Sequence, residues 1–93
     1  MPNARAHVEI TGTVQGVGFR FSCLREAGKH TTITGWVRNT WDGGVEAVFE
    51  GDRKEVEAMV AWCHEGPVSA DVRKVDVDWQ KPTEEFKGFN IRP

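Results

Sequence analysis

A glycine-rich segment near the start of the chain combines a flexible backbone with a cation. Residues 13–20 read Thr-Val-Gln-Gly-Val-Gly-Phe-Arg. Such a loop between a strand and a helix can turn several backbone N–H groups toward one point, where the helix N-terminus adds its own. The planar guanidinium of Arg20 can bond two oxygens of a phosphoryl group at once. The segment therefore predicts a dianion pocket, although a tight turn followed by a surface arginine fits the same spacing.

A second candidate for chemistry is Asn39, which lies where a β-rich segment meets a turn. Residues 35–43 read Gly-Trp-Val-Arg-Asn-Thr-Trp-Asp-Gly, and the final Asp-Gly pair is a strong hairpin signal. A carboxamide both donates and accepts hydrogen bonds, so Asn39 could hold a water molecule in line for attack. An ordinary turn asparagine fits this pattern as well. The residues alone leave both interpretations open.

The hydrophobic pattern predicts the elements that would position these two segments. Alternation with period two predicts strands, and apolar residues at helical spacing predict two amphipathic helices. Asp52 and Glu55 have the spacing of a capping box at the start of the second helix. The predicted strands cover about 6–11, 31–39, 45–50 and 74–79, the helices about 20–28 and 53–63, and a short edge strand contains Phe89 and Ile91. This β-α-β-β-α-β order predicts an α+β, ferredoxin-like split βαβ fold, with two helices on one face of an antiparallel sheet.

The composition narrows the class of protein. The 93 residues are enough for one compact domain, 1–93, and a net charge of −2 argues against a nucleic-acid partner. Cys23 and Cys63 form no CxxC pair and the histidines lack zinc-ligand spacing, so we expect two reduced thiols and no metal or other cofactor. No signal peptide precedes the first strand and no apolar run approaches a membrane span of ~20 residues. We therefore expect a cytoplasmic protein without a membrane partner.

Together, the two segments resemble the acylphosphatase family. Residues 12–20 match that family's pattern G-x-V-Q-G-V-x-[F/Y]-R, and residues 35–45 match its pattern G-[F/Y/W]-[A/V/C]-[basic]-N-x-x-x-G-x-V. The similarity continues through Gly66-Pro67, the strand at 72–79 and the ending 88–92. Family members usually have one residue fewer between the first helix and Gly35, so the conformation of that connection is left open. The final Pro93 stands where an aromatic residue is common.

The resemblance implies a metal-free hydrolase that splits acyl phosphates into carboxylate and inorganic phosphate. It makes Arg20 the phosphate-binding catalytic arginine and Asn39 the residue that positions the attacking water, with Thr40 helping to hold the Asn39 side chain. The water would attack phosphorus directly and pass its proton to the substrate's own phosphoryl oxygen. Inorganic phosphate would be both product and inhibitor, and we expect a monomer. The backbone amides implied to cradle the phosphate are those of Gln15, Gly16, Val17, Gly18, Phe19 and Arg20.

Three alternatives fit the sequence less well than an acylphosphatase. A covalent mechanism would need a base beside Ser22 or Cys23, and the sequence places none there. A nucleic-acid or ligand-binding module is suggested faintly by residues 18–21, but RNA-stacking aromatics belong on central strands rather than at a loop–helix junction. Acylphosphatase-like domains also occur inside larger regulatory or carbamoyl-transferring proteins. A chain that starts at Met1 and ends just after its last strand favours the free-standing enzyme.

Overall fold

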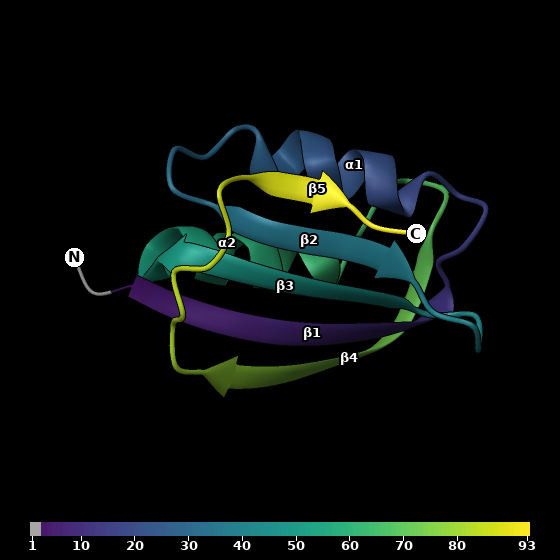
Figure 1. The fold of residues 1–93 in the computed structure, drawn as a ribbon. Coiled ribbons are helices and arrows are strands. Elements are labelled where there is room, and N and C mark those ends of the chain that lie inside the picture. The colour runs from purple at the N-terminus through teal and green to yellow at the C-terminus, as the bar shows by residue number, and fades with distance from the viewer. Residues whose placement is uncertain (1–2) are drawn as a thin grey trace.

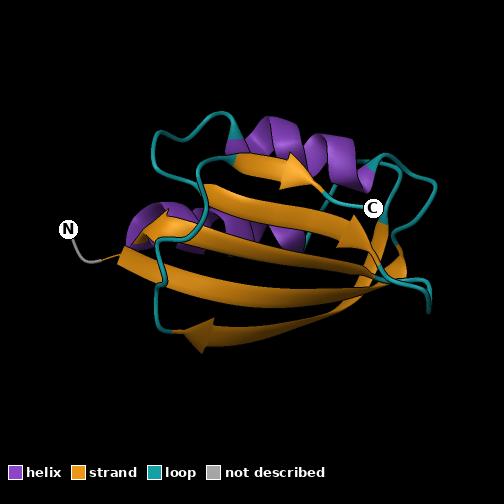
Figure 2. Ribbon diagram, viewed as in Figure 1, coloured by secondary structure: helices purple, strands orange, loops and turns teal. Residues whose placement is uncertain are grey.

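The computed structural model describes residues 3–93, which form two helices and five strands in one α+β arrangement (Figure 1). Both helices lie on the same face of a single sheet, and the other face carries no helix (Figure 2). The predicted split βαβ fold is therefore confirmed. The elements are β1 (Asn3–Thr13), α1 (Phe19–Ala27), β2 (Thr34–Asn39), β3 (Val45–Asp52), α2 (Arg53–Cys63), β4 (Asp71–Gln80) and β5 (Phe89–Ile91).

The sheet has the strand order β4-β1-β3-β2-β5, and its four longer strands are antiparallel as predicted. The short C-terminal edge strand differs, because β5 pairs in parallel with β2. The chain leaves β4 at one edge of the sheet, crosses to the other edge and reverses direction, so β5 runs the same way as β2 (Figure 1). The sheet is therefore mixed rather than wholly antiparallel.

A buried carboxylate fixes the connection that crosses between β4 and β5. Glu50 on β3 is only 3% exposed. It accepts hydrogen bonds from the backbone N–H groups of Thr83 and Glu84 at 3.3 and 2.6 Å, and Arg5 pairs with it at 3.3 Å. Buried charges persist where they are paired and hydrogen-bonded in this way. These bonds hold the connection against the sheet and so determine where β5 begins.

The core lies between the sheet and the two helices. Alternate residues of β1 point into it, with Ala6, Val8 and Ile10 at most 1% exposed. Phe19 on α1 packs against Trp62 on α2, with ring centroids 5.2 Å apart. The residues that α1 and α2 bury in this core are Phe19, Cys23, Ala27, Val56, Met59 and Cys63.

The period-two spacing predicts the buried face of β1, and the stripe at Val56, Met59 and Cys63 predicts that of α2. In α1 the three-residue spacing of Phe21, Leu24 and Ala27 predicts the wrong face, because Phe21 and Leu24 are 71% and 36% exposed. The helix starts at Phe19, whose ring packs on Trp62, and this places Cys23 rather than Phe21 and Leu24 in the core.

The two cysteines are free thiols in this core rather than a disulfide. Burial, together with the neighbouring Cys63, raises the pKa of the Cys23 thiol well above its ordinary value. Burial likewise raises the pKa of Cys63 to about 12. Because the thiolate is the reactive form of cysteine, both residues are poor nucleophiles in the folded protein.

The connection between α1 and β2, the one-residue-longer segment, is organised by α2. Asp52 caps that helix as predicted, since its side chain accepts from the Lys54 N–H at 2.9 Å. Glu55 does not complete the capping box. It accepts hydrogen bonds from the backbone N–H groups of Thr31 and Thr32 at 3.3 and 2.9 Å, and from both hydroxyls. The bonds from Thr32 and Thr31 lower the pKa of Glu55 from its ordinary 4.5 to about 2.

Candidate active site

The glycine-rich loop joins the end of β1 to the start of α1, where the sequence places it. Strand β1 shifts register between Thr11 and Gly12, so the chain bends just before the loop. Within the loop, Gly16 and Gly18 adopt φ values of 76° and 78°, a left-handed conformation that glycine takes without strain. A Cβ at either position would meet no atom within 4 Å. Backbone conformation, rather than lack of space, therefore requires these two glycines.

The start of α1 is left open to an anion. Gly18 occupies the N-cap position, and no side chain caps the helix there. The first turn contains no acidic residue either. The first N–H groups of a helix lack partners within the helix and carry its positive dipole end. This helix start therefore combines unsatisfied donors with positive potential.

Arg20 adds a charge at the same place. It is the second residue of α1 and is partly exposed. Among residues 3–93, no ion pair involves Arg20. Its guanidinium is therefore free to pair with an anion from solution.

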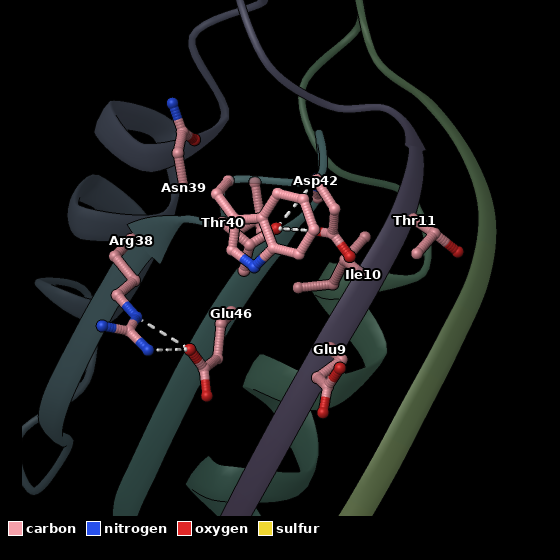
Figure 3. Close-up of a pocket in the computed structure, with 11 residues that line it drawn as sticks. Glu9, Ile10, Thr11, Arg38, Asn39, Thr40, Asp42 and Glu46 are labelled. Carbon is pink, nitrogen blue, oxygen red and sulfur yellow. Dashed lines mark hydrogen bonds and ion pairs between the residues drawn. The ribbon is translucent and has the colours of Figure 1, made fainter.

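Asn39 ends β2 and belongs to the helix-covered face of the sheet. It lies two residues after Val37, which is fully buried on that face, and it is opposite Val45 of β3. Figure 3 shows its side chain pointing away from Glu9 and Glu46, which project from the uncovered face. The end of β2 and the loop before α1 lie at the same end of the molecule (Figure 1). The fold thus brings both sequence motifs to one region.

Thr40 closes the turn that follows Asn39. Its hydroxyl donates to an Asp42 carboxylate oxygen at 2.5 Å and accepts from the Gly44 N–H at 3.0 Å. The Thr40 N–H donates to the Gly44 carbonyl at 2.9 Å. These bonds belong to the turn, and support of the Asn39 side chain by Thr40 stays a prediction.

The two motifs are in direct contact through Gln15. Its side-chain Nε2 donates to the carbonyl oxygens of Thr40 at 2.7 Å and of Gly44 at 2.9 Å. From the sequence, only the backbone amide of Gln15 is expected to contribute to the site. The pattern of the loop gives no sign of where the side chain points, so this contact required the structure.

A hollow of about 450 Å³ lies on the uncovered face, behind the hairpin rather than at the loop. Its lining includes the candidate site residues Asn39 and Thr40 together with Glu9, Arg38 and Glu46, but none of residues 15–20. Burial alone would raise the pKa of Glu46, yet hydrogen bonds from His7 and Arg38 outweigh it and keep the pKa below its ordinary value. The uncapped start of α1 and Arg20 lie outside this hollow.

Within residues 3–93, no group of three or more His, Cys, Asp or Glu side chains could hold a metal ion. In the same range, neither helix has the length and apolar character needed to cross a membrane. By class, this protein is an α+β fold of the split βαβ type whose first helix starts without a capping side chain and carries Arg20 in its first turn.

The comparison with known families agrees with that class. The acylphosphatase family model matches residues 6–91, and the chain belongs to this family, whose members are enzymes acting on acyl phosphates. An acylphosphatase of Roseiflexus sp. (strain RS-1) is 56% identical over 91 residues, which cover 98% of this chain and 97% of the relative. The structure of an acylphosphatase from Coxiella burnetii superposes with a TM-score of 0.89 at 36% identity, covering 97% of this chain and 93% of that one.

The same fold also occurs as a small part of a larger protein. The structure of full-length HypF in a phosphate- and nucleotide-bound form matches with a TM-score of 0.84 at 27% identity. The match covers 99% of this chain but only 12% of HypF. The covered shares thus separate two kinds of relative, one of about this length and one much longer.

Proposed function

We propose that this protein hydrolyses the carboxyl-phosphate bond of acyl phosphates with Arg20 and the amides of residues 15–20 as its phosphate-binding groups. One observation carries the proposal: the start of α1 has neither a capping side chain nor an acidic residue, while Arg20 beside it has no ion pair within residues 3–93. A phosphoryl group would satisfy both. Its oxygens accept hydrogen bonds from N–H groups, and its charge suits the guanidinium fork and the helix dipole.

Catalysis then depends on position and charge rather than on a strong nucleophile. Phosphoryl transfer builds charge on the oxygens around phosphorus, and donors fixed before the reaction stabilise that charge without reorganising. Arg20 and the loop amides would supply these donors. The acyl group needs no activation by the protein, because a carboxylate is already a good leaving group.

Asn39 would place the attacking water behind phosphorus. Its side chain lies on the same side of the sheet as α1, and the hydrogen bonds that close the following turn do not use it. The water oxygen forms a bond to phosphorus while the phosphorus–oxygen bond to the acyl group breaks. The carboxylate leaves with that electron pair, and the water's proton passes to a phosphoryl oxygen of the substrate.

A covalent intermediate fits the structure less well than direct attack by water. Cys23 is fully buried and its pKa is raised, so it offers no thiolate to the site. The remaining expectations belong to the same proposal. They are a single domain over residues 1–93, a cytoplasmic monomer that needs no cofactor, release of inorganic phosphate that also inhibits, and no nucleic-acid partner.

The proposal is tested by hydrolysis of benzoyl phosphate and acetyl phosphate in ¹⁸O-labelled water. Attack on phosphorus puts the label into inorganic phosphate, whereas attack on the acyl carbon puts it into the carboxylate. We expect label only in phosphate, with activity unchanged by exhaustive chelation. Label in the carboxylate would overturn the assigned mechanism, and activity lost on chelation and restored by Mg²⁺ or Zn²⁺ would overturn the metal-free assignment.

A further inference from the structure

The side chain of Gln15 is committed to the hairpin rather than to the substrate. Its Nε2 donates at 2.7 Å to the Thr40 carbonyl and at 2.9 Å to the Gly44 carbonyl. A neutral carboxamide nitrogen carries two hydrogens, so both donors are used. Val14, the preceding residue, is 1% exposed and anchors the base of the loop in the core. The Gln15 side chain is therefore held by two hydrogen bonds, and the residue before it is held in the core.

The two acceptors, the carbonyl oxygens of Thr40 and Gly44, lie where the turn between β2 and β3 begins and ends, which we call the neck of the hairpin. Thr40 directly follows Asn39, and its N–H donates to the Gly44 carbonyl at 2.9 Å across the neck. A Cβ on Gly44 would come within 2.9 Å of the Ile10 carbonyl oxygen, so the neck also lies tightly against β1. The hairpin can shift relative to the loop only if the Gln15 bonds stretch.

We propose that the Gln15 side chain is a positioning residue that sets where Asn39 stands relative to the phosphate loop. The inference rests on the proposed roles of Asn39 and of residues 15–20. The loop holds phosphorus and the hairpin holds the water, so the Gln15 bonds fix the distance along which the water attacks. A misplacement of about 1 Å between reacting groups can cost ~10²-fold in rate.

A carboxamide is suited to this task in a way that similar side chains are not. Methionine has nearly the same length and volume but no donor, so both carbonyls would lose their partner. Glutamate would place a negative charge against two carbonyl oxygens. Asparagine keeps both hydrogens but is one methylene too short to reach the neck with the backbone in place. These three replacements separate the donors from the shape and reach of the side chain.

The main test is a double-mutant cycle that combines Gln15→Met with Asn39→Ala. If Gln15 acts through Asn39, Gln15→Met lowers kcat about 10- to 100-fold in wild type but adds little to Asn39→Ala. Its KM and the inhibition constant of inorganic phosphate should stay within about threefold, because the loop amides and Arg20 remain. Gln80→Met, at the only other glutamine and on the far end of β4, is the matched control and should keep wild-type kinetics.

The outcomes distinguish this inference from the proposed function. An equal loss of kcat from Gln15→Met in both backgrounds would overturn the positioning role, as would a collapse of phosphate affinity or an unchanged kcat. A wild-type kcat in Asn39→Ala would instead overturn the assigned role of Asn39. If Gln15→Met does not fold, the cycle is run with Gln15→Asn. Its shorter side chain also loses both bonds, so we expect a similar loss of kcat and the same lack of additivity.

Discussion

Two loops of this molecule can be compared by what their backbone N–H groups bind, which is an observed carboxylate in one loop and the phosphate that we propose in the other. The loop at residues 28–33 turns the N–H groups of Thr31 and Thr32 onto the carboxylate of Glu55, which their hydroxyls also contact. The loop at residues 14–18 leads into a helix whose first turn has no acidic residue. One loop is filled by the protein's own carboxylate, and the other is not.

The difference shows how backbone N–H groups in a loop can serve either to hold the fold together or to bind a ligand. Amides that meet an internal carboxylate lock α2 to the entry of β2 and leave nothing for a ligand. At the proposed site, the amides of residues 15–20 would instead bind an oxyanion from solution. The position of a single acidic residue therefore decides which loop belongs to the fold and which to the proposed site.

The largest effect that would test this contrast is expected from Arg20→Ala. Removal of one donor that stabilises transition-state charge costs roughly 10²–10³ in turnover. Steady-state kinetics with benzoyl phosphate measure the loss. Arg25→Ala, an exposed arginine in the last turn of the same helix, is the matched control and should keep wild-type turnover. Near-normal activity of a folded Arg20→Ala protein would show that Arg20 does not stabilise the transition state, and the proposed site would be wrong.

Asn39→Ala should lower turnover by ~10²-fold, because the water is no longer held in line. Inhibition by inorganic phosphate should persist, since the proposed anion-binding groups are untouched. Measured kcat and the phosphate inhibition constant separate the two roles. If phosphate affinity fell together with turnover, the water and the anion would not be handled by different groups.

Inorganic phosphate should fill the open loop and stabilise the folded state. At a hundredfold excess over Kd the linkage is about 2.7 kcal/mol. For a domain of this size that corresponds to a rise in Tm of roughly 10 °C or more. Phosphate also stabilises proteins by exclusion from their surfaces, so the same titration is run on Arg20→Ala. A saturable shift that is equally large in that variant would show that residues 15–20 hold no phosphate.

The contribution of the loop at residues 28–33 to stability should depend on pH, with a smaller effect on Tm than phosphate has at the other loop. The pKa of Glu55 lies at about 2 in the folded protein and at its ordinary 4.5 in the unfolded chain. The unfolded state therefore binds the proton more readily as the pH falls, and the stabilisation by Glu55 is present above pH 4.5 and lost toward pH 2. The Tm gap between wild type and Glu55→Gln should be widest above pH 4.5 and close as the pH falls toward 2.

Glu57→Gln, at an exposed neighbour paired with Arg53 in the same helix, serves as the control for that pH series. Phosphate should still raise the Tm of Glu55→Gln by as much as it raises that of wild type. If the Tm difference between wild type and Glu55→Gln did not change with pH, the Glu55 carboxylate would not be the group that the Thr31 and Thr32 N–H groups bind.

The sequence predicts the parts of this structure that depend on local pattern. Alternation in residues 6–11 and the stripe at Val56, Met59 and Cys63 give the buried faces, and two motifs give the loop and the turn. The sequence does not predict contacts between distant side chains. Glu55 has capping-box spacing but bonds to Thr31 and Thr32, because the connection before β2 folds back onto α2.

The side-chain contacts of Gln15 and the parallel pairing of the predicted edge strand β5 were not foreseen, for the same reason. The reach of Gln15 to residues 25 and 29 positions further along depends on how the hairpin packs beside β1. The parallel pairing of β5 follows from the crossing connection that Glu50 holds. Neither is encoded in the spacing of neighbouring residues. The candidate site residues that the motifs predict are those whose neighbours along the chain belong to the same candidate site.

Because both thiols are buried, the rate at which each is alkylated measures how often its helix opens. Cys23 belongs to the helix that carries Arg20, and Cys63 to the other helix, and both are inaccessible and protonated in the folded state. An alkylating reagent can therefore react with each thiol only while the helix that carries that thiol is detached from the sheet. The rates of labelling at the two positions, counted by mass spectrometry, report whether the helix at the proposed site detaches alone or together with its neighbour.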